Sequence, residues 1–163
     1  MRVIVLADTH APRFWKSCPA PVAAWLADAD LILHAGDVCT ASVLTELSGY
    51  APVRAVLGNN DRPDVAAWGA SARLEADIGG VAVGMIHDSG PARGRLRRMH
   101  ASFPAAELVI FGHSHIPLDE QDEQLRIFNP GSPTDKRRQP TGTIGVLDII
   151  DGELAAARIV GVS

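Results

Sequence analysis

Residues 3–35, VIVLADTHAPRFWKSCPAPVAAWLADADLILHA, contain the pattern that decides the fold. The stretch begins and ends in short apolar runs at 3–7 and 31–35 that do not alternate with polar residues, which is typical of strands covered on both faces. Between them, a helical stretch at 19–29 opens with prolines, which a first helical turn tolerates. A strand, a helix and a strand in this order pair in parallel through a right-handed crossover. We therefore expect an α/β fold with a parallel sheet.

The alternation continues along the chain and then changes in character. A second helical stretch at 40–50 leads to another apolar run, VRAVL, at 53–57. The segments after Phe111 instead follow one another through Asn-Pro-Gly and Asp-Gly turns with no helix between them, so the last third should be mainly antiparallel. We expect two mixed β-sheets packed together with helices outside. Further strands are predicted at 81–86, 108–111, 125–129, 143–150 and 153–162, and further helices from Pro63 to about Gly69 and at 92–103.

The composition limits size, partners and location. A chain of 163 residues with 47% hydrophobic content can bury the core of one domain, so residues 1–163 are expected to form a single unit. Its formal charge of -4 gives no general attraction to nucleic acid or to an anionic membrane. No stretch approaches the ~20 apolar residues of a membrane span, and the two cysteines form no CxxC pair. We expect a cytoplasmic protein that acts on a small molecule, and the composition leaves homo-oligomer formation open.

Polar side chains follow the predicted parallel strands at the point where each strand ends. In open α/β sheets this is the end at which sites form. Two of the pairs, Asp8 with His10 and His113 with His115, have a spacing of two, which in extended chain puts both side chains on one face. Each pair can therefore bind a metal ion from one side. The full set is Asp8, His10, Asp37, Asn59, His87, His113 and His115.

This set of side chains has the chemistry of a transition-metal site. Two carboxylates, four imidazoles and one amide suit Mn²⁺, Fe²⁺, Zn²⁺ or Ni²⁺ better than Ca²⁺ or a thiolate-bound zinc. Seven ligands exceed what one such ion needs, but they match two ions that share Asp37 and clamp a phosphoryl group. Burying so many polar groups at one end of a sheet would be costly without a cation.

For several other residues, two interpretations of their role are open. His34 is favoured as a packing residue or as support for the site rather than as a ligand. Phe14 or Trp15 could form a rim for an aromatic substrate group, although loop packing is favoured. Cys39 could be a redox-sensitive neighbour of the site or a small hydrophobic residue. Four arginines in one helix more often form its solvated face than a phosphate contact: Arg93, Arg95, Arg97 and Arg98.

The order of the polar motifs resembles that of one known family. DTH, GDV, GNND, IHD and GHSH, which fit the order D-x-H, G-D, G-N-x-D, H and G-H-x-H, resemble the calcineurin-like metallophosphoesterase superfamily over residues 3–133. NPGS at 129–132 is similar to the segment after G-H-x-H in its small single-domain bacterial and archaeal phosphodiesterases. The resemblance implies a four-layer αββα sandwich. It also implies one metal on Asp8, His10, Asp37 and His115, and a second on Asp37, Asn59, His87 and His113.

The sequence departs from the family pattern at two places. The family often has a His after the ligand Asn, paired with the next acid and held to assist the leaving group, whereas this chain has Asn60 before Asp61. We assign the catalytic positions to Asn60 and Asp61, with the difference that an amide cannot give up a proton near neutral pH. The motif IHD replaces the more usual His-Gly, which makes His87 the least typical ligand.

The resemblance implies a two-metal phosphoesterase, for phosphodiesters rather than monoesters, in which a metal-bound hydroxide attacks the phosphorus. We expect manganese first, with nickel, iron or zinc as alternatives. The rival is a catalytically weak or inactive scaffold that resembles the small subunit of the retromer complex. The complete set of ligands favours the enzyme. A nuclease for polymeric DNA is disfavoured, because the chain is acidic and compact.

Overall fold

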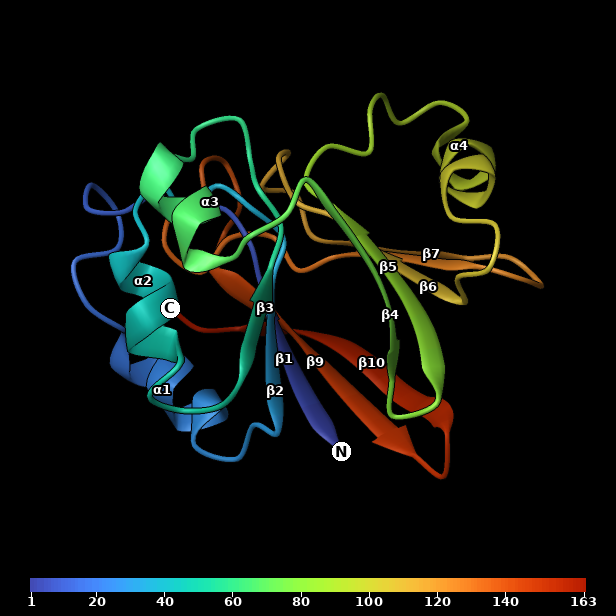
Figure 1. Cartoon of the computed structure of the whole chain (residues 1–163), viewed down its shortest axis with the longest axis horizontal. Helices are drawn as coiled ribbons and strands as arrows, with labels where there is room; N and C mark the ends of the chain where they lie inside the picture. The colour runs from blue at the N-terminus through green and yellow to red at the C-terminus, as the bar shows by residue number, and fades with distance from the viewer.

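Figure 1 shows the computed structural model, which describes residues 1–163, as a sandwich of four layers. Two five-stranded sheets form the inner layers. The helices α1 (Ala20–Leu26), α2 (Ser42–Leu47) and α3 (Pro63–Trp68) cover one side, and α4 (Arg95–Ser102) covers the other (Figure 1). None of these helices has the length and apolar character needed to cross a membrane. The predicted αββα architecture is confirmed.

The first sheet has the order β10-β9-β1-β2-β3. Its parallel part is the unit predicted from residues 3–35, because β1 pairs in parallel with β2 and aligns Val3 with Leu31. The chain adds the antiparallel hairpin of β9 and β10 beside β1, as the C-terminal sequence predicts. The strand bounds are β1 (Arg2–Leu6), β2 (Leu31–His34), β3 (Val53–Ala55), β9 (Thr143–Ile150) and β10 (Glu153–Gly161).

The second sheet has the order β4-β5-β6-β8-β7. The strands β5 and β6 are parallel, and β6 is also parallel to β8, whereas the edge strands β4 and β7 are antiparallel to their neighbours. The strand bounds are β4 (Arg73–Ile78), β5 (Val81–Ile86), β6 (Leu108–Ile110), β7 (Leu118–Gln121) and β8 (Arg126–Asn129).

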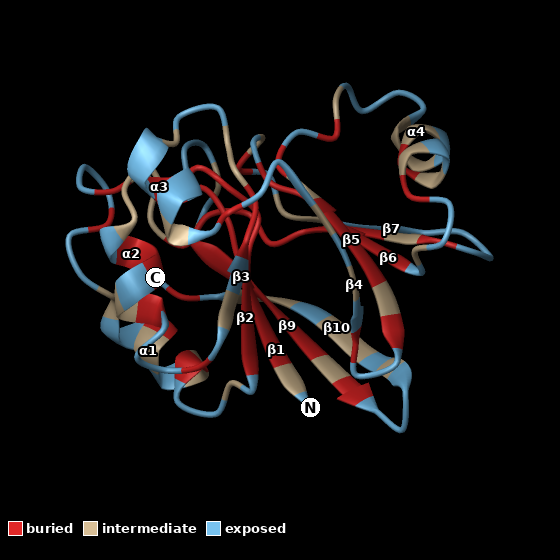
Figure 2. Cartoon of the chain, in the orientation of Figure 1, coloured by how far each residue is buried: buried red, intermediate tan, exposed pale blue.

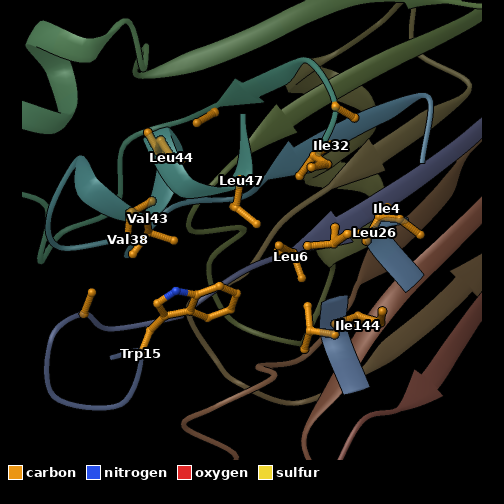
Figure 3. Packing of buried hydrophobic residues seen from close by; sticks show 14 of the residues in the cluster. Ile4, Leu6, Trp15, Leu26, Ile32, Val38, Val43, Leu44, Leu47 and Ile144 are labelled. Atoms are coloured by element: carbon orange, nitrogen blue, oxygen red, sulfur yellow. The ribbon is translucent and has the colours of Figure 1, made fainter. Parts of the chain in front are cut away.

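Three clusters of buried side chains fill the three spaces between the layers. Along β1, Ile4 and Leu6 face the helices while Val3 and Val5 face the second sheet, so this strand is buried on both sides (Figure 2). Trp15 lies in the cluster under the helices (Figure 3), and its indole N–H donates to Glu46 Oε2 at 2.8 Å. Trp15 is therefore a core residue rather than a rim residue. A third cluster lies between α4 and the second sheet.

Three parts of the fold differ from the prediction. The prediction of a mainly antiparallel last third is wrong for β8, which pairs in parallel with β6 because the chain first forms β7 and then turns back. The edge strands β4 and β7 were not predicted, since they expose many residues and contain no continuous apolar run. The helix α4 starts at Arg95 rather than near residue 92, because Gly94 before it has a left-handed φ of 70°.

The predicted Asp-Gly hairpin between β9 and β10 is confirmed. Asp151 and Gly152 have φ values of 53° and 84°, and tight two-residue hairpins of this kind need positive φ at both positions.

Candidate metal centre

The loops that follow β1 and β2 are held side by side by backbone hydrogen bonds. The N–H groups of Asp8 and His10 donate to the carbonyl oxygens of Gly36 and Asp37, each at 3.0 Å. Both loops lie at the C-terminal ends of parallel strands, on the side of the sandwich away from the N-terminus (Figure 1). This continued pairing brings the side chains of the two loops to one place.

Left-handed backbone, rather than extended chain, orients most of the predicted ligands. The expectation that a spacing of two in extended chain turns each pair toward one ion is therefore wrong in its mechanism. For His113 and His115 it is also wrong in its outcome, because the two side chains lie in different groups of donor atoms. Positive φ is uncommon outside glycine, and it concentrates at sites whose surroundings enforce it. The φ values are 55° at Asp8, 49° at His10, 57° at Asp37, 68° at His113 and 59° at His115.

Asp8, His10 and His115 form the first group of donor atoms. His10 Nε2 lies 3.2 Å from His115 Nε2, and the two rings are stacked with centroids 5.1 Å apart. Asp8 Oδ1 lies 3.5 Å from His115 Nε2 and 3.9 Å from His10 Nε2. The three side chains therefore present one oxygen and two nitrogens to a common point.

Asp37, His87 and His113 form the second group, with Asn59 beside it. His87 Nε2 lies 3.4 Å from Asp37 Oδ2 and 3.3 Å from His113 Nδ1. Asn59 Oδ1 lies 3.0 Å from the same His113 nitrogen. His113 thus uses Nδ1 where the other three histidines use Nε2. His87, the least typical ligand by motif, is buried at the centre of this group.

Asp37 lies between the two groups. Its Oδ2 is 3.4 Å from His87 Nε2 in the second group and 3.6 Å from His10 Nε2 in the first. Gly58 makes this position available, because a Cβ there would overlap the Asp37 carboxylate. The structure therefore brings all seven predicted residues together, with Asp37 in the place that a bridging ligand requires.

The separations between donor atoms fit divalent ions. Nitrogen and oxygen ligands about 2.1 Å from one ion stand roughly 3.0 Å apart at octahedral angles and roughly 3.4 Å apart at tetrahedral angles. Asp8 adds a second indication, because both of its carboxylate oxygens are buried without a hydrogen-bond partner. Burial raises the pKa of Asp8 to about 7. A buried carboxylate without a partner is expensive, and a cation between the two groups would remove that cost.

Backbone carbonyls fix the tautomers of two histidines. His115 Nδ1 lies 2.6 Å from the Asp135 carbonyl oxygen, and His87 Nδ1 lies 2.7 Å from that of Ala35. A carbonyl oxygen only accepts, so each Nδ1 must be protonated, and the neutral ring then turns the lone pair of Nε2 toward the centre. His10 Nδ1 has a weaker partner, the Cys39 sulfur at 3.5 Å.

The surroundings shift the pKa values of the candidate ligands in both directions. Burial lowers the pKa values of His10 and His115, and the positive charge of Arg137 lowers both further. Burial alone would raise the pKa of Asp37, but hydrogen bonds from His87 and Asn60 outweigh it and hold that pKa below its usual range. Burial likewise opposes protonation of His87, yet its bonds to Asp37 and Ala35 raise its pKa. His10 and His115 are thus held as neutral imidazoles and Asp37 as a carboxylate, whereas Asp8 and His87 are shifted toward their protonated forms.

Asn60 and Asp61 lie beside the centre but are occupied by other partners. The Asn60 side-chain N–H donates to Asp37 Oδ2 at 2.7 Å, and its backbone N–H donates to Asp37 Oδ1 at 2.8 Å. The carboxylate of Asp61 accepts from the backbone N–H groups of Cys39 and Gly58 at 2.6 and 2.7 Å. Asn60 therefore orients Asp37, and Asp61 joins the loops after β2 and β3.

The segment after β8 supports the site in a way that the sequence analysis missed. The Ser132 hydroxyl donates to the Asp8 carbonyl oxygen at 2.8 Å, and the Thr134 hydroxyl donates to the Thr9 carbonyl oxygen at 3.0 Å. Arg137, five residues after Ser132, is exposed and forms no ion pair, yet its charge acts on Asp8, His10 and His115. The only feature of the sequence that indicated a role for this segment was the NPGS motif at 129–132.

The remaining candidates have structural partners. His34 is fully buried, with Nε2 3.1 Å from the Thr9 hydroxyl, and lies behind the site rather than in it. Arg98 Nε donates to the Ser89 carbonyl oxygen at 2.8 Å, and Arg95 stacks over the Phe111 ring at 5.1 Å. These two arginines hold the 88–94 loop and α4. Phe14 is 40% exposed beside Arg13.

Comparison with known proteins agrees with this geometry. A curated relative from Methanothermobacter thermautotrophicus, a probable metallophosphoesterase, is 36% identical over 163 residues, which cover 98% of this chain and 92% of the relative. A Vps29 variant from Entamoeba histolytica has a TM-score of 0.78 at 22% identity, and the alignment covers 99% of both chains. A solved archaeal phosphodiesterase has a TM-score of 0.76 at 21% identity, also over 99% of both. At such identities the two structures show the fold alone.

The family is shown by a match along most of the sequence. Residues 1–152 match the calcineurin-like phosphoesterase superfamily domain, and this range includes every candidate ligand. Family and site together point to divalent metal binding. The chain therefore belongs to the calcineurin-like phosphoesterase superfamily.

Proposed function

We propose that this protein is a dinuclear metal-dependent phosphodiesterase for a small substrate. The observation that carries the proposal is the buried Asp8 carboxylate, whose two oxygens have no hydrogen-bond partner and which belongs to the first of two groups of donor atoms. Two divalent ions fit this arrangement, one on Asp8, His10, Asp37 and His115, the other on Asp37, Asn59, His87 and His113. When bound, such ions neutralise phosphate charge and acidify water.

The residues of the chain supply positioning and charge around that centre. Asn60 holds both oxygens of Asp37, and the Nδ1 contacts of His87 and His115 hold these two rings. Arg137 is the exposed cation whose charge acts on the first group, and we assign it to a non-bridging phosphate oxygen of the substrate. These groups are in place before substrate arrives, which is the arrangement that electrostatic catalysis requires.

The preference for diesters rests on charge and on similarity. A diester carries one negative charge and a monoester nearly two, and the carboxylate of Asp88, which is not a candidate ligand, lines a pocket beside the second group and would repel the additional charge. One solved structure that shares this fold is described as an archaeal phosphodiesterase. Manganese is the ion we expect first, with nickel, iron or zinc as alternatives.

The test is metal restoration. The purified protein is stripped with a chelator, loaded separately with Mn²⁺, Ni²⁺, Fe²⁺, Zn²⁺ or Mg²⁺, and assayed with bis(p-nitrophenyl) phosphate and p-nitrophenyl phosphate. We expect turnover of the diester with at least one transition metal, and less turnover of the monoester. The variant Asp37→Ala, loaded in the same way, should lose this activity.

The second candidate is a metal-binding scaffold, because the Vps29 structures share the fold along nearly the whole chain. One of them is described as a complex with zinc, so metal binding alone does not separate the candidates. The same experiment does so: metal uptake without turnover of either ester would favour the scaffold.

A further inference from the structure

A pocket opens beside the second group of donor atoms. It has a volume of about 270 Å³. It lies where the end of β3 meets the start of β4, since Val56 and Ser71 form an isolated bridge and the Leu57 N–H donates to the Ser71 carbonyl oxygen at 2.8 Å. Its lining residues are Leu57, Asn59, Ala72, Ile86, His87, Asp88 and His113.

The lining divides into three chemical parts. Asn59, His87 and His113 are candidate ligands, so one wall of the pocket is the metal centre itself. The apolar part of the lining comes from Leu57, Ala72 and Ile86. A group attached to a phosphate at the centre would therefore pass directly into an apolar space.

We infer that this pocket receives one ester group of the substrate and selects an uncharged group about the size of one ring. The inference rests on the proposed phosphodiesterase function and names its substrate class. The volume supports a group of this size, because pockets for whole drug-sized ligands begin at roughly 300 Å³. The three apolar side chains favour an aromatic or aliphatic ester group over a polar, hydrated ester group.

Asp88 supplies the selection against charge. Its Oδ1 accepts the Gly90 N–H at 2.7 Å, which fixes the carboxylate at the pocket. A second anionic group on the substrate, such as a further phosphate or a carboxylate, would meet this carboxylate at short range.

The first test fills the pocket. Ala72 is exposed and lines it, so Ala72→Leu adds volume there without disturbing the core; the matched control is Ala101→Leu, at an exposed position of α4. Calorimetry on the Mn²⁺-loaded protein measures the affinities of diphenyl phosphate and dimethyl phosphate, which have the same charge. We expect diphenyl phosphate to bind roughly tenfold more tightly in the wild type and in the control, and nearly equal affinities in Ala72→Leu.

The outcomes separate this inference from the function on which it rests. If dimethyl phosphate binds normally but Ala72→Leu retains the full preference for diphenyl phosphate, the pocket is not the ester site. If neither diester binds to the metal-loaded wild type, the proposed function fails and this inference fails with it.

The second test changes the charge. Asp88→Asn should improve the affinity of bis(4-carboxyphenyl) phosphate about fivefold and leave that of diphenyl phosphate unchanged, because only the former must place a second negative charge in the pocket. Equal effects on the two diesters would show that Asp88 does not select against charge in the pocket.

Discussion

At the scale of single residues, the site depends on two carboxylates with opposite environments. Asp37 is surrounded by donors from His87 and Asn60, which hold its pKa low despite burial. Both carboxylate oxygens of Asp8 are buried without a hydrogen-bond partner, and burial raises its pKa to about 7. The chain itself thus stabilises the charged form of Asp37, whereas the charged form of Asp8 would gain most from a bound cation.

The position of Asp37 between the groups gives a prediction about stoichiometry. Asp37→Ala should lose both ions, because the shared ligand also offsets repulsion between the two cations, whereas Asp8→Ala should mainly weaken one site. Metal content of the purified variants measures this, with circular dichroism as the control for folding. Equal loss of both ions in the two folded variants would contradict the bridge.

The buried His34 gives a prediction about pH. Burial lowers its pKa to about 3, whereas in the unfolded chain a histidine titrates near 6.5. Below pH 6.5 the unfolded state therefore binds more protons, so the free energy of unfolding should fall as pH drops from about 6.5 toward about 3, and this penalty is absent above 6.5.

The measurement is the difference in unfolding free energy between the metal-free wild type and His34→Gln, followed from pH 8 to pH 4. The wild type should lose up to about 1.4 kcal/mol more per pH unit in this window than the variant does. A difference that stays constant with pH would show that His34 is not buried in its neutral form.

At the scale of elements, the segment after β8 supports the candidate site together with the loops at the strand ends. Ser132 and Thr134 hold the backbone of the Asp8–Thr9 loop, and the Asp135 carbonyl holds His115. The same short segment then presents Arg137 in left-handed backbone, with a φ of 48°. Support for the candidate ligands and the exposed cation of Arg137 thus come from one connection.

The neighbouring arginines of this segment allow a matched comparison. Arg137→Ala should raise KM for bis(p-nitrophenyl) phosphate about tenfold with a smaller effect on kcat, because a charge-assisted contact to phosphate is lost. Arg138→Ala, which removes an exposed charge from the next position, should change KM by less than twofold. Similar effects of the two variants would indicate general electrostatics rather than a contact.

The sequence predicted the elements and residues whose signal is local. Continuous apolar runs identify β1 and β2 because both faces of these strands are buried. The strand β4 could not be found in this way, since its pattern of exposure depends on which sheet edge it joins. The candidate site followed the same rule, because its seven candidate ligands were predicted from side-chain type and position along the chain. The hydrogen bonds of Asn60 to Asp37 and the effect of Arg137 on Asp8 depend instead on contacts between distant segments.

At the scale of the whole molecule, the candidate centre joins the two sheets. Asp8, His10 and Asp37 follow strands of the first sheet, whereas His87, His113 and His115 follow strands of the second. Gly112 permits the close approach of the loop after β6 to the loop after β1, because a Cβ at Gly112 would lie 2.9 Å from the Ala7 side chain. Ions bound at this place would link the inner layers of the sandwich at one end.

This link predicts a large effect of metal on stability. A ligand that binds only the native state at about one hundred times its Kd adds about 2.7 kcal/mol, which for a chain of this size raises Tm by roughly 5–10 °C. Thermal unfolding with and without saturating Mn²⁺ measures the shift, and Asp37→Ala is the control in which it should vanish. An unchanged Tm in the wild type would count against an intact centre.

The left-handed backbone at five candidate ligands also bears on how ions enter. Because the loops already hold this conformation, ion capture requires little rearrangement of the chain, and the slow step becomes the loss of the ion's own water shell. Mg²⁺ gives up its water reluctantly and prefers oxygen donors. A rigid, imidazole-rich cavity should therefore discriminate against Mg²⁺ kinetically as well as by affinity, and keep the centre available to scarcer transition metals.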